Sequence, residues 1–386
     1  MTEAQSILIE LIGNVLCDKP TSFDSLSDEK LKEVYALAKR HDLSHFIGAA
    51  LSKKKISVSD TAFQHYQNIL FETVVRMRQI SYELDRVCQA LEQAEIIFIP
   101  LKGAVIKNYY PEFWMRTSCD IDILVHKKDL KKAIAVINSN GRFSVSGKHY
   151  HDVSLVADGR INIELHFSIL EANNNLDAVL KDVWEYTEPF EKHNYFMRLT
   201  PEFFLFHIYA HAAYHFLRGG CGIRSLMDIY LLENSLKYDG KLLEELLEKA
   251  KIKQFSFELR YLGEVWFSNA DHSKITLSME KYIFSGGVYG TKKNNVIVRS
   301  TDRSYDRYIL RRIFMPYDVI RSIYPILNRH KYLTPIFEVV RWVRFIFKGN
   351  YEARINEVKT LNSLNADDKQ QIDEMLKNLG LREDGK

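Results

Sequence analysis

Two aspartates stand two residues apart in an otherwise apolar segment, Asp120 and Asp122 in RTSCDIDILV (116–125). In an extended strand, alternating side chains place both carboxylates on one face and the apolar side chains on the other. Their Cα atoms would lie roughly 6.5 Å apart, so both carboxylates can reach one divalent cation, or a pair of cations about 3.5–4 Å apart. Hard oxygen ligands at this spacing suit Mg²⁺. Such a pair by itself is more typical of the wet face of a half-exposed strand.

A third carboxylate strengthens the metal interpretation. In RINIELHF (160–167) the same alternation puts Asn162, Glu164 and His166 on one face, and we expect this strand to neighbour the aspartates. Three converging carboxylates repel one another unless a cation neutralises them, so the grouping predicts bound metal. Two Mg²⁺ ions, or Mn²⁺ as the alternative, would equip the site for in-line phosphoryl or nucleotidyl transfer.

A turn before the aspartates could bind phosphate. Lys102 and Gly103 stand between a short apolar run and a predicted helix, where free backbone N–H groups and the helix dipole favour anions. Gly103 would let phosphate approach the backbone, and Lys102 would supply charge. Arg116 is a further candidate phosphate contact. The alternatives are an ordinary turn with a solvated lysine, and a surface arginine.

The periodicity of apolar residues predicts the elements that position these groups. Helical spacing fills residues 1–94, with Ser27 as a predicted N-cap; a period of two fills 95–190; helical spacing returns over 191–386, interrupted by a loop at 285–295. Within the middle region we expect strands at 96–99, 116–125, 152–157 and 160–167, helices at 102–110 and 128–138, and a hairpin turn at Asp158-Gly159.

Composition narrows the class of protein. The chain has 386 residues, 46% hydrophobic and 27% charged, with a net charge of +3, as in a folded soluble protein that is no general polyanion binder. Four separated cysteines argue against a disulfide framework or a thiolate zinc site. The first residues lack the basic n-region of a signal peptide, and no apolar run reaches membrane-spanning length. We therefore expect a cytoplasmic protein.

Five motifs together resemble a known family: LKG (101–103), YP (110–111), RTSCDIDILV (116–125), IELHF (163–167) and HIYAHAAYHF (207–216). The pattern resembles the uncharacterised nucleotidyltransferase family of the polymerase-beta-type nucleotidyltransferase superfamily, over about residues 30–345. The resemblance implies an α+β fold, in which a small mixed-sheet nucleotidyltransferase core is flanked by all-helical N-terminal and C-terminal regions. It also implies that Asp120, Asp122 and Glu164 bind the metals.

One motif departs from that superfamily. Lys102-Gly103 stands where the pattern has Gly-Ser, so the hydroxyl contact to the nucleotide phosphates is either missing or supplied by Thr117 or Ser118. The departure leaves two hypotheses beside an enzyme that moves an NMP from an NTP, such as ATP, to a hydroxyl acceptor on a small molecule or protein. One is a catalytically silent nucleotide- or partner-binding module, antitoxin-like; the other is an RNA-binding or RNA-modifying protein.

Histidines recur near these motifs. His207, His211 and His215 share one helix face at a spacing that can bind zinc, but no HExxH glutamate accompanies them, and packing or a polar wall beside the site is the favoured explanation. His151, His166 and His211 are candidates to orient a carboxylate or contact the acceptor.

The segment 296–359 interleaves arginines with aromatic side chains, which favours either a packed helical region with a cationic surface or a nucleic-acid platform. On the packed interpretation, which we favour, Val339, Val340, Val343 and Ile346 face a core.

Overall fold

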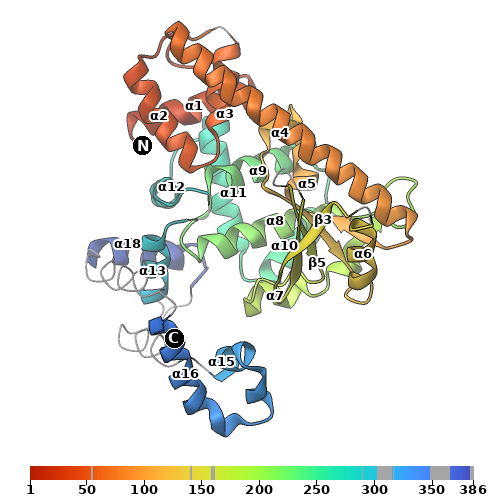
Figure 1. The fold of residues 1–386 in the computed structure, drawn as a ribbon. Helices are drawn as coiled ribbons and strands as arrows, with labels where there is room; N and C mark the ends of the chain where they lie inside the picture. The colour runs from red at the N-terminus through yellow and green to blue at the C-terminus, as the bar shows by residue number, and fades with distance from the viewer. Residues whose placement is uncertain are drawn as a thin grey trace.

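A computed structural model describes residues 1–53, 55–139, 141–157, 161–288, 290–301, 315, 317–347 and 366–382. It shows a mixed five-stranded sheet in the middle of the chain with helices at both ends (Figure 1). The long helix α4 (Asp60–Gln93) runs from the N-terminal helices to the sheet. The α+β class predicted from the sequence is confirmed.

The helices before the sheet are α1 (Glu3–Cys17), α2 (Asp28–Arg40), α3 (Ser44–Ser52) and α4. Ser27 caps α2 as predicted, because its hydroxyl accepts from the Lys30 backbone N–H. Ser59 caps α4 in the same way. The helices after the sheet are α8 (Pro201–Phe216), α9 (Ile223–Ser235), α10 (Gly240–Lys249), α11 (Lys253–Ser268), α12 (Lys274–Gly286), α13 (Lys292–Thr301), α15 (Tyr317–Ile323), α16 (Thr334–Phe347) and α18 (Ala366–Asn378).

The central region supplies the sheet and short helices. Its elements are β1 (Phe98–Pro100), α5 (Gly103–Ile106), β2 (Asp120–Val125), α6 (Leu130–Ile137), β3 (Phe143–Lys148), β4 (Asp152–Ala157), β5 (Ile161–His166) and α7 (Asn174–Leu180), followed by a separate hairpin of β6 (Thr187–Pro189) and β7 (Met197–Leu199). The strand order is β1-β2-β5-β4-β3. Within the described five-stranded sheet, β2 and β5 are the pair that runs parallel, and this pairing sets Asp120 opposite Asn162 and Asp122 opposite Glu164.

Two apolar cores hold the chain together. One lies between the sheet, α4 and α6, and includes Leu91, Ile123 and Ile163. The other is continuous from the N-terminal helices to the C-terminal ones, joining Phe46 to Phe206. This second core contains residues from all three predicted regions, and the domain boundaries at residues 94 and 190 stay a prediction.

Several local predictions need correction. The first strand lies at Phe98–Pro100 instead of 96–99. The helix expected to reach Tyr110 is a single turn, α5, continued by a 3₁₀ turn at Lys107–Tyr109. Strand β3 was not predicted, because FSVSGK is polar and mostly exposed at the sheet edge, where no apolar alternation is required. The Asp158-Gly159 hairpin lies outside the described residues.

The apolar stripe predicted on α16 is wrong. Val339 and Val343 are 62% and 47% exposed, whereas Glu338 and Arg341 are buried. The reason is an ion pair of Arg341 with Glu338, whose carboxylate also accepts from the Met315 backbone N–H, so the polar face of α16 is the one that packs inward. Much of the basic aromatic segment, residues 302–314 and 348–365, lies outside the described part of the chain. Within the described part, no helix is long and apolar enough to cross a membrane.

Candidate active site

Strands β2 and β5 bring the predicted carboxylates together. Asp122 and Glu164 are direct neighbours in the parallel register, and Asp120 lies two register pairs before them on the same face of β2. Asp122 is 5% exposed, while Asp120 and Glu164 are half-buried. Ligand atoms of Asp122, Glu164 and His166 lie within 4.8 Å of one another. Asp120 stands outside this tightest group.

Asp122 is the best-compensated of the three carboxylates. Its Oδ1 lies 2.7 Å from His166 Nε2 and 3.4 Å from the Lys102 ammonium. Burial raises the pKa of Asp122, but the charge of Lys102 and the hydrogen bond from His166 lower it by more than burial raises it. The pKa of Asp122 therefore lies well below its ordinary value. Asp122 therefore stays ionised.

The environment of the other two carboxylates disfavours their charged form. Burial first, and the charge on Asp122 second, raise the pKa of both Asp120 and Glu164 above the ordinary values. Ser118 partly relieves Asp120, since its hydroxyl lies 3.0 Å from Oδ1. This surplus of negative charge is the condition that a divalent cation would relieve, and the carboxylate oxygens are the ligands that Mg²⁺ prefers.

Backbone contacts hold Lys102 over β2. The N–H of Leu101 donates to the carbonyl of Asp122 at 3.0 Å, which fixes the turn against the strand. Lys102 has φ 44° and ψ −121°, a region that disfavours a side chain and suits glycine. The backbone of Lys102 is therefore strained in the conformation that places its ammonium beside Asp122.

Gly103 has a packing reason of its own. A Cβ there would lie 3.2 Å from the Ser118 hydroxyl and 3.6 Å from a guanidinium nitrogen of Arg116. The glycine thus lets the segment before β2 approach the turn closely. Because α5 is a single turn, the strong helix-terminus dipole expected from the sequence is not formed here.

Arg116 is buried and ion-paired. Its Nε lies 2.6 Å from Asp228 Oδ1, which also accepts from the Tyr110 hydroxyl at 2.6 Å, and another guanidinium nitrogen donates to the Thr117 carbonyl. Asp228 is therefore a shared partner of Arg116 and Tyr110. Arg116 as a phosphate contact stays a prediction.

The Thr117 and Ser118 hydroxyls, which could replace the serine of the superfamily's Gly-Ser turn, already make hydrogen bonds within the protein. Thr117 donates to Asp42 at 2.8 Å, and Ser118 donates to the backbone carbonyl of Asp120 at 2.6 Å. Arg224 joins this group through Asp42 and the Thr117 carbonyl.

The α8 histidines form a polar wall on a pocket beside the carboxylates. The pocket encloses about 520 Å³ out to its open mouth, and its polar lining includes Lys102, Arg116, His211, His215, Arg224 and Asp228. His211 lies 2.9 Å from Glu171 and 3.1 Å from His215. Burial lowers the pKa of His207 and His215 to about 3 and that of His211 well below normal, so all three rings are neutral at pH 7.

Sequence reasoning missed Glu171, Asp42 and Asp152. Glu171 contributes to the negative charge around Lys102 and orients His211, yet it lies in a loop where no periodicity marks it. Asp42 has a positive φ at the end of α2, and only the tertiary fold brings it to Thr117.

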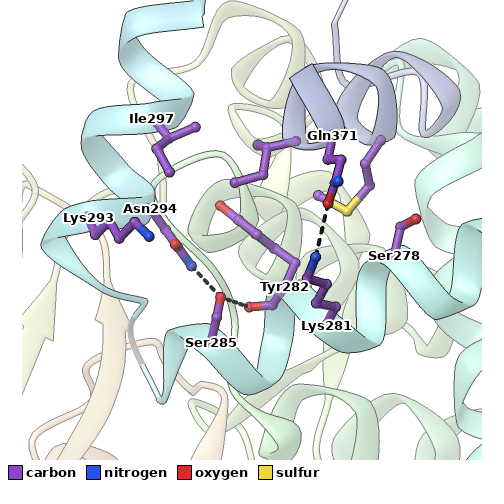
Figure 2. Close-up of a pocket in the computed structure, with 10 residues that line it drawn as sticks. Ser278, Lys281, Tyr282, Ser285, Lys293, Asn294, Ile297 and Gln371 are labelled. Carbon is purple, nitrogen blue, oxygen red and sulfur yellow. Dashed lines mark hydrogen bonds between the residues drawn. The ribbon is translucent and has the colours of Figure 1, made fainter. Parts of the chain in front are cut away.

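A second cavity lies away from the carboxylates, between α12, α13 and α18 (Figure 2). Its polar groups satisfy one another: Lys281 donates to Gln371 at 2.9 Å, and Asn294 donates to Ser285 at 2.8 Å. Ser285 in turn donates to the Tyr282 carbonyl. These contacts join the C-terminal helix to its neighbours and give no catalytic grouping.

Comparison with known proteins agrees with the geometry. The model of the family described as "Uncharacterised nucleotidyltransferase" matches residues 27–268, which include the sheet, the three carboxylates and the α8 histidines. No curated protein and no solved structure matches the chain. The family match covers more than half of the sequence, and the chain therefore belongs to the uncharacterised nucleotidyltransferase family.

Proposed function

We propose that the protein is a Mg²⁺-dependent nucleotidyltransferase that moves an NMP from an NTP, with ATP the expected donor, to a hydroxyl acceptor on a small molecule or protein. The observation that carries the proposal is the parallel β2–β5 register, which sets Asp122 beside Glu164 with Asp120 on the same face. Divalent ions bound there would neutralise the donor phosphates and lower the pKa of the attacking hydroxyl.

Each residue has a stated part in the reaction. Asp120, Asp122 and Glu164 hold the metal, and His166 orients the Asp122 carboxylate through their 2.7 Å contact. Lys102 and Arg116, which both line the adjoining pocket, face the phosphates. Gly103 and Ser118 shape the turn below them. His151 stacks on His166 and His211 hydrogen-bonds to Glu171, so both act on the site through a neighbouring residue.

The reaction forms one bond and breaks one. The acceptor oxygen attacks the α-phosphorus, the bond from that phosphorus to the bridging oxygen breaks, and pyrophosphate leaves with the bond electrons. Glu164, beside Asp122 in the parallel register, takes the acceptor proton. Acceptor choice lies with the helices around the pocket. A cytoplasmic location belongs to the same proposal, since four unpaired cysteines suit a reducing compartment.

The test follows label from α-labelled NTPs into acceptors in lysate fractions, with pyrophosphate release measured in parallel. Transfer should require Mg²⁺ or Mn²⁺ and fall at least about 100-fold in Asp120→Asn and Glu164→Gln. Lys128→Met, which alters an exposed lysine after β2, serves as the control. Transfer that survives in both carboxamide variants would disprove the role of these carboxylates.

A silent binding module is the second candidate, favoured by the Lys102–Asp122 ion pair, which already places a cation on the central carboxylate. Calorimetric titration with Mg²⁺ and each NTP separates the two functions. Tight nucleotide binding without pyrophosphate release in any acceptor fraction would favour the module over the enzyme.

A further inference from the structure

A second group of metal-type ligands lies next to the carboxylates. Asp152 pairs with His166 across the β4–β5 ladder, and His151 precedes Asp152. Ligand atoms of His151, Asp152 and His166 all lie within 4.8 Å of one another. His151 Nε2 stands 3.0 Å from Asp152 Oδ1. A tetrahedral ion with bonds near 2.0 Å requires ligand atoms about 3.3 Å apart, so this pair already approximates one edge of such a site.

Asp152 is a buried carboxylate without a fixed cation. It is 3% exposed, and no lysine or arginine among the described residues lies within ion-pair distance of it. Within the described part of the chain, its carboxylate also contacts the Ser154 hydroxyl at 3.5 Å. A buried charge of this kind is costly unless it is paired or binds a metal.

His166 has the bonding pattern of a metal-binding histidine. Its Nε2 lies 2.7 Å from the Asp122 carboxylate. Its other ring nitrogen, Nδ1, is buried and has no hydrogen-bond partner among the residues that the structure describes, and the residue is only 4% exposed. Histidines that bind metal almost always donate their other N–H to a carboxylate or carbonyl, which fixes the tautomer that leaves a lone pair for the ion. An unpartnered buried nitrogen in this arrangement points to a ligand.

We propose that His151, Asp152 and His166 bind a divalent transition metal, with Zn²⁺ as the ion that suits them best. Two imidazoles and one carboxylate are borderline ligands that favour Zn²⁺ over Mg²⁺. Three protein ligands leave a fourth position open. The site differs from the carboxylate cluster, where Asp120, Asp122 and Glu164 offer only oxygen.

His166 would join the two sites. Metal on Nδ1 holds the ring with its Nε2–H towards Asp122, so the transition metal sets the orientation of a carboxylate that binds Mg²⁺. This site is independent of the proposed transferase activity, because it requires only that the ion bind.

Zinc binding tests the inference directly. The full chain is stripped of metal with a chelator and titrated with Zn²⁺ against a chromophoric competitor. Excess Mg²⁺ is present to occupy the carboxylate cluster of Asp120, Asp122 and Glu164. Co²⁺ then reports the geometry through its visible absorption. The variants are His151→Ala and Asp152→Asn, with His149→Ala as the matched control on the same loop and Asp120→Asn as the control for the carboxylate cluster. Circular dichroism checks that each variant is folded.

We expect one tightly bound Zn²⁺ per chain, four-coordinate Co²⁺ absorption, and at least about 100-fold weaker zinc binding in both His151→Ala and Asp152→Asn. His149→Ala and Asp120→Asn should bind as the unmodified protein does. Unchanged affinity in folded His151→Ala overturns the assignment even if Asp152→Asn does not fold. An equal loss in His149→Ala or Asp120→Asn overturns it too, as does the absence of tight zinc binding in the unmodified chain.

Discussion

Replacing Lys102 by methionine should destabilise the metal-free protein, because the ammonium is the cation closest to the central carboxylate. Nζ lies 3.4 Å from Asp122 Oδ1, and the charges of Glu171, Asp120 and Glu164 also act on it. At an effective dielectric constant of about 20, two unit charges at this distance attract by about 5 kcal/mol. Removing one partner of a buried pair typically costs about 3–5 kcal/mol.

The expected loss is smaller than either figure. The Lys102 side chain is 22% exposed, so solvent screens part of the attraction, and Asp122 keeps its contact with His166. We expect the free energy of unfolding to fall by about 2–3 kcal/mol at neutral pH in a chelator-containing buffer. Urea unfolding followed by circular dichroism measures it, and Lys128→Met should stay within about 0.5 kcal/mol of the unmodified chain.

The loss should depend on pH and Mg²⁺. Lys102 lowers the pKa of Asp122 in the folded state, so its stabilisation is fully present above the unfolded-state pKa near 3.9 and is lost as pH falls through the folded value. The difference between the variant and the unmodified chain should therefore be widest near pH 7 and shrink in acid. Bound Mg²⁺ should narrow it, since the ion supplies the missing positive charge. Equal stability of the two proteins in chelator at pH 7 would refute the electrostatic role of Lys102.

Four further results are expected. Lys102→Gly should be about 1 kcal/mol more stable than Lys102→Met, because both lack the ammonium but only glycine suits φ 44° and ψ −121°; urea unfolding compares them, and the reverse order would exclude strain at this residue. Asp228→Asn should cost about 3–5 kcal/mol, because it removes the carboxylate that pairs with the buried Arg116 guanidinium, while Tyr110→Phe should cost only about 1 kcal/mol; urea unfolding measures both. Apparent Mg²⁺ affinity, followed calorimetrically, should weaken on acidification at a higher pH than for ordinary carboxylates, since the raised pKa values of Asp120 and Glu164 let protons compete earlier; affinity that falls only near pH 4 would contradict this. Glu171→Gln should raise KM more than it lowers kcat, because Glu171 supports the pocket wall through its hydrogen bond with His211; a selective loss of kcat would place it at the chemistry.

The sequence by itself determined the strands that carry the carboxylates and their common face. Alternation in DIDILV and INIELH leaves no other arrangement once the apolar face is buried, and the register confirms that Asp122 and Glu164 are neighbours. The long helix α4 and the cap at Ser27 were equally readable, because apolar spacing and capping chemistry are local.

Tertiary structure alone decided the partners of these groups. Nothing local ties Arg116 to Asp228 or Lys102 to Asp122, since each pair joins elements that meet only when the chain is folded. The same holds for α16, where a valine stripe predicts a buried face but an ion pair and a backbone contact turn the helix the other way. Periodicity fixes which side chains share a face, whereas contacts between distant segments fix their charge, their neighbours and therefore their chemistry.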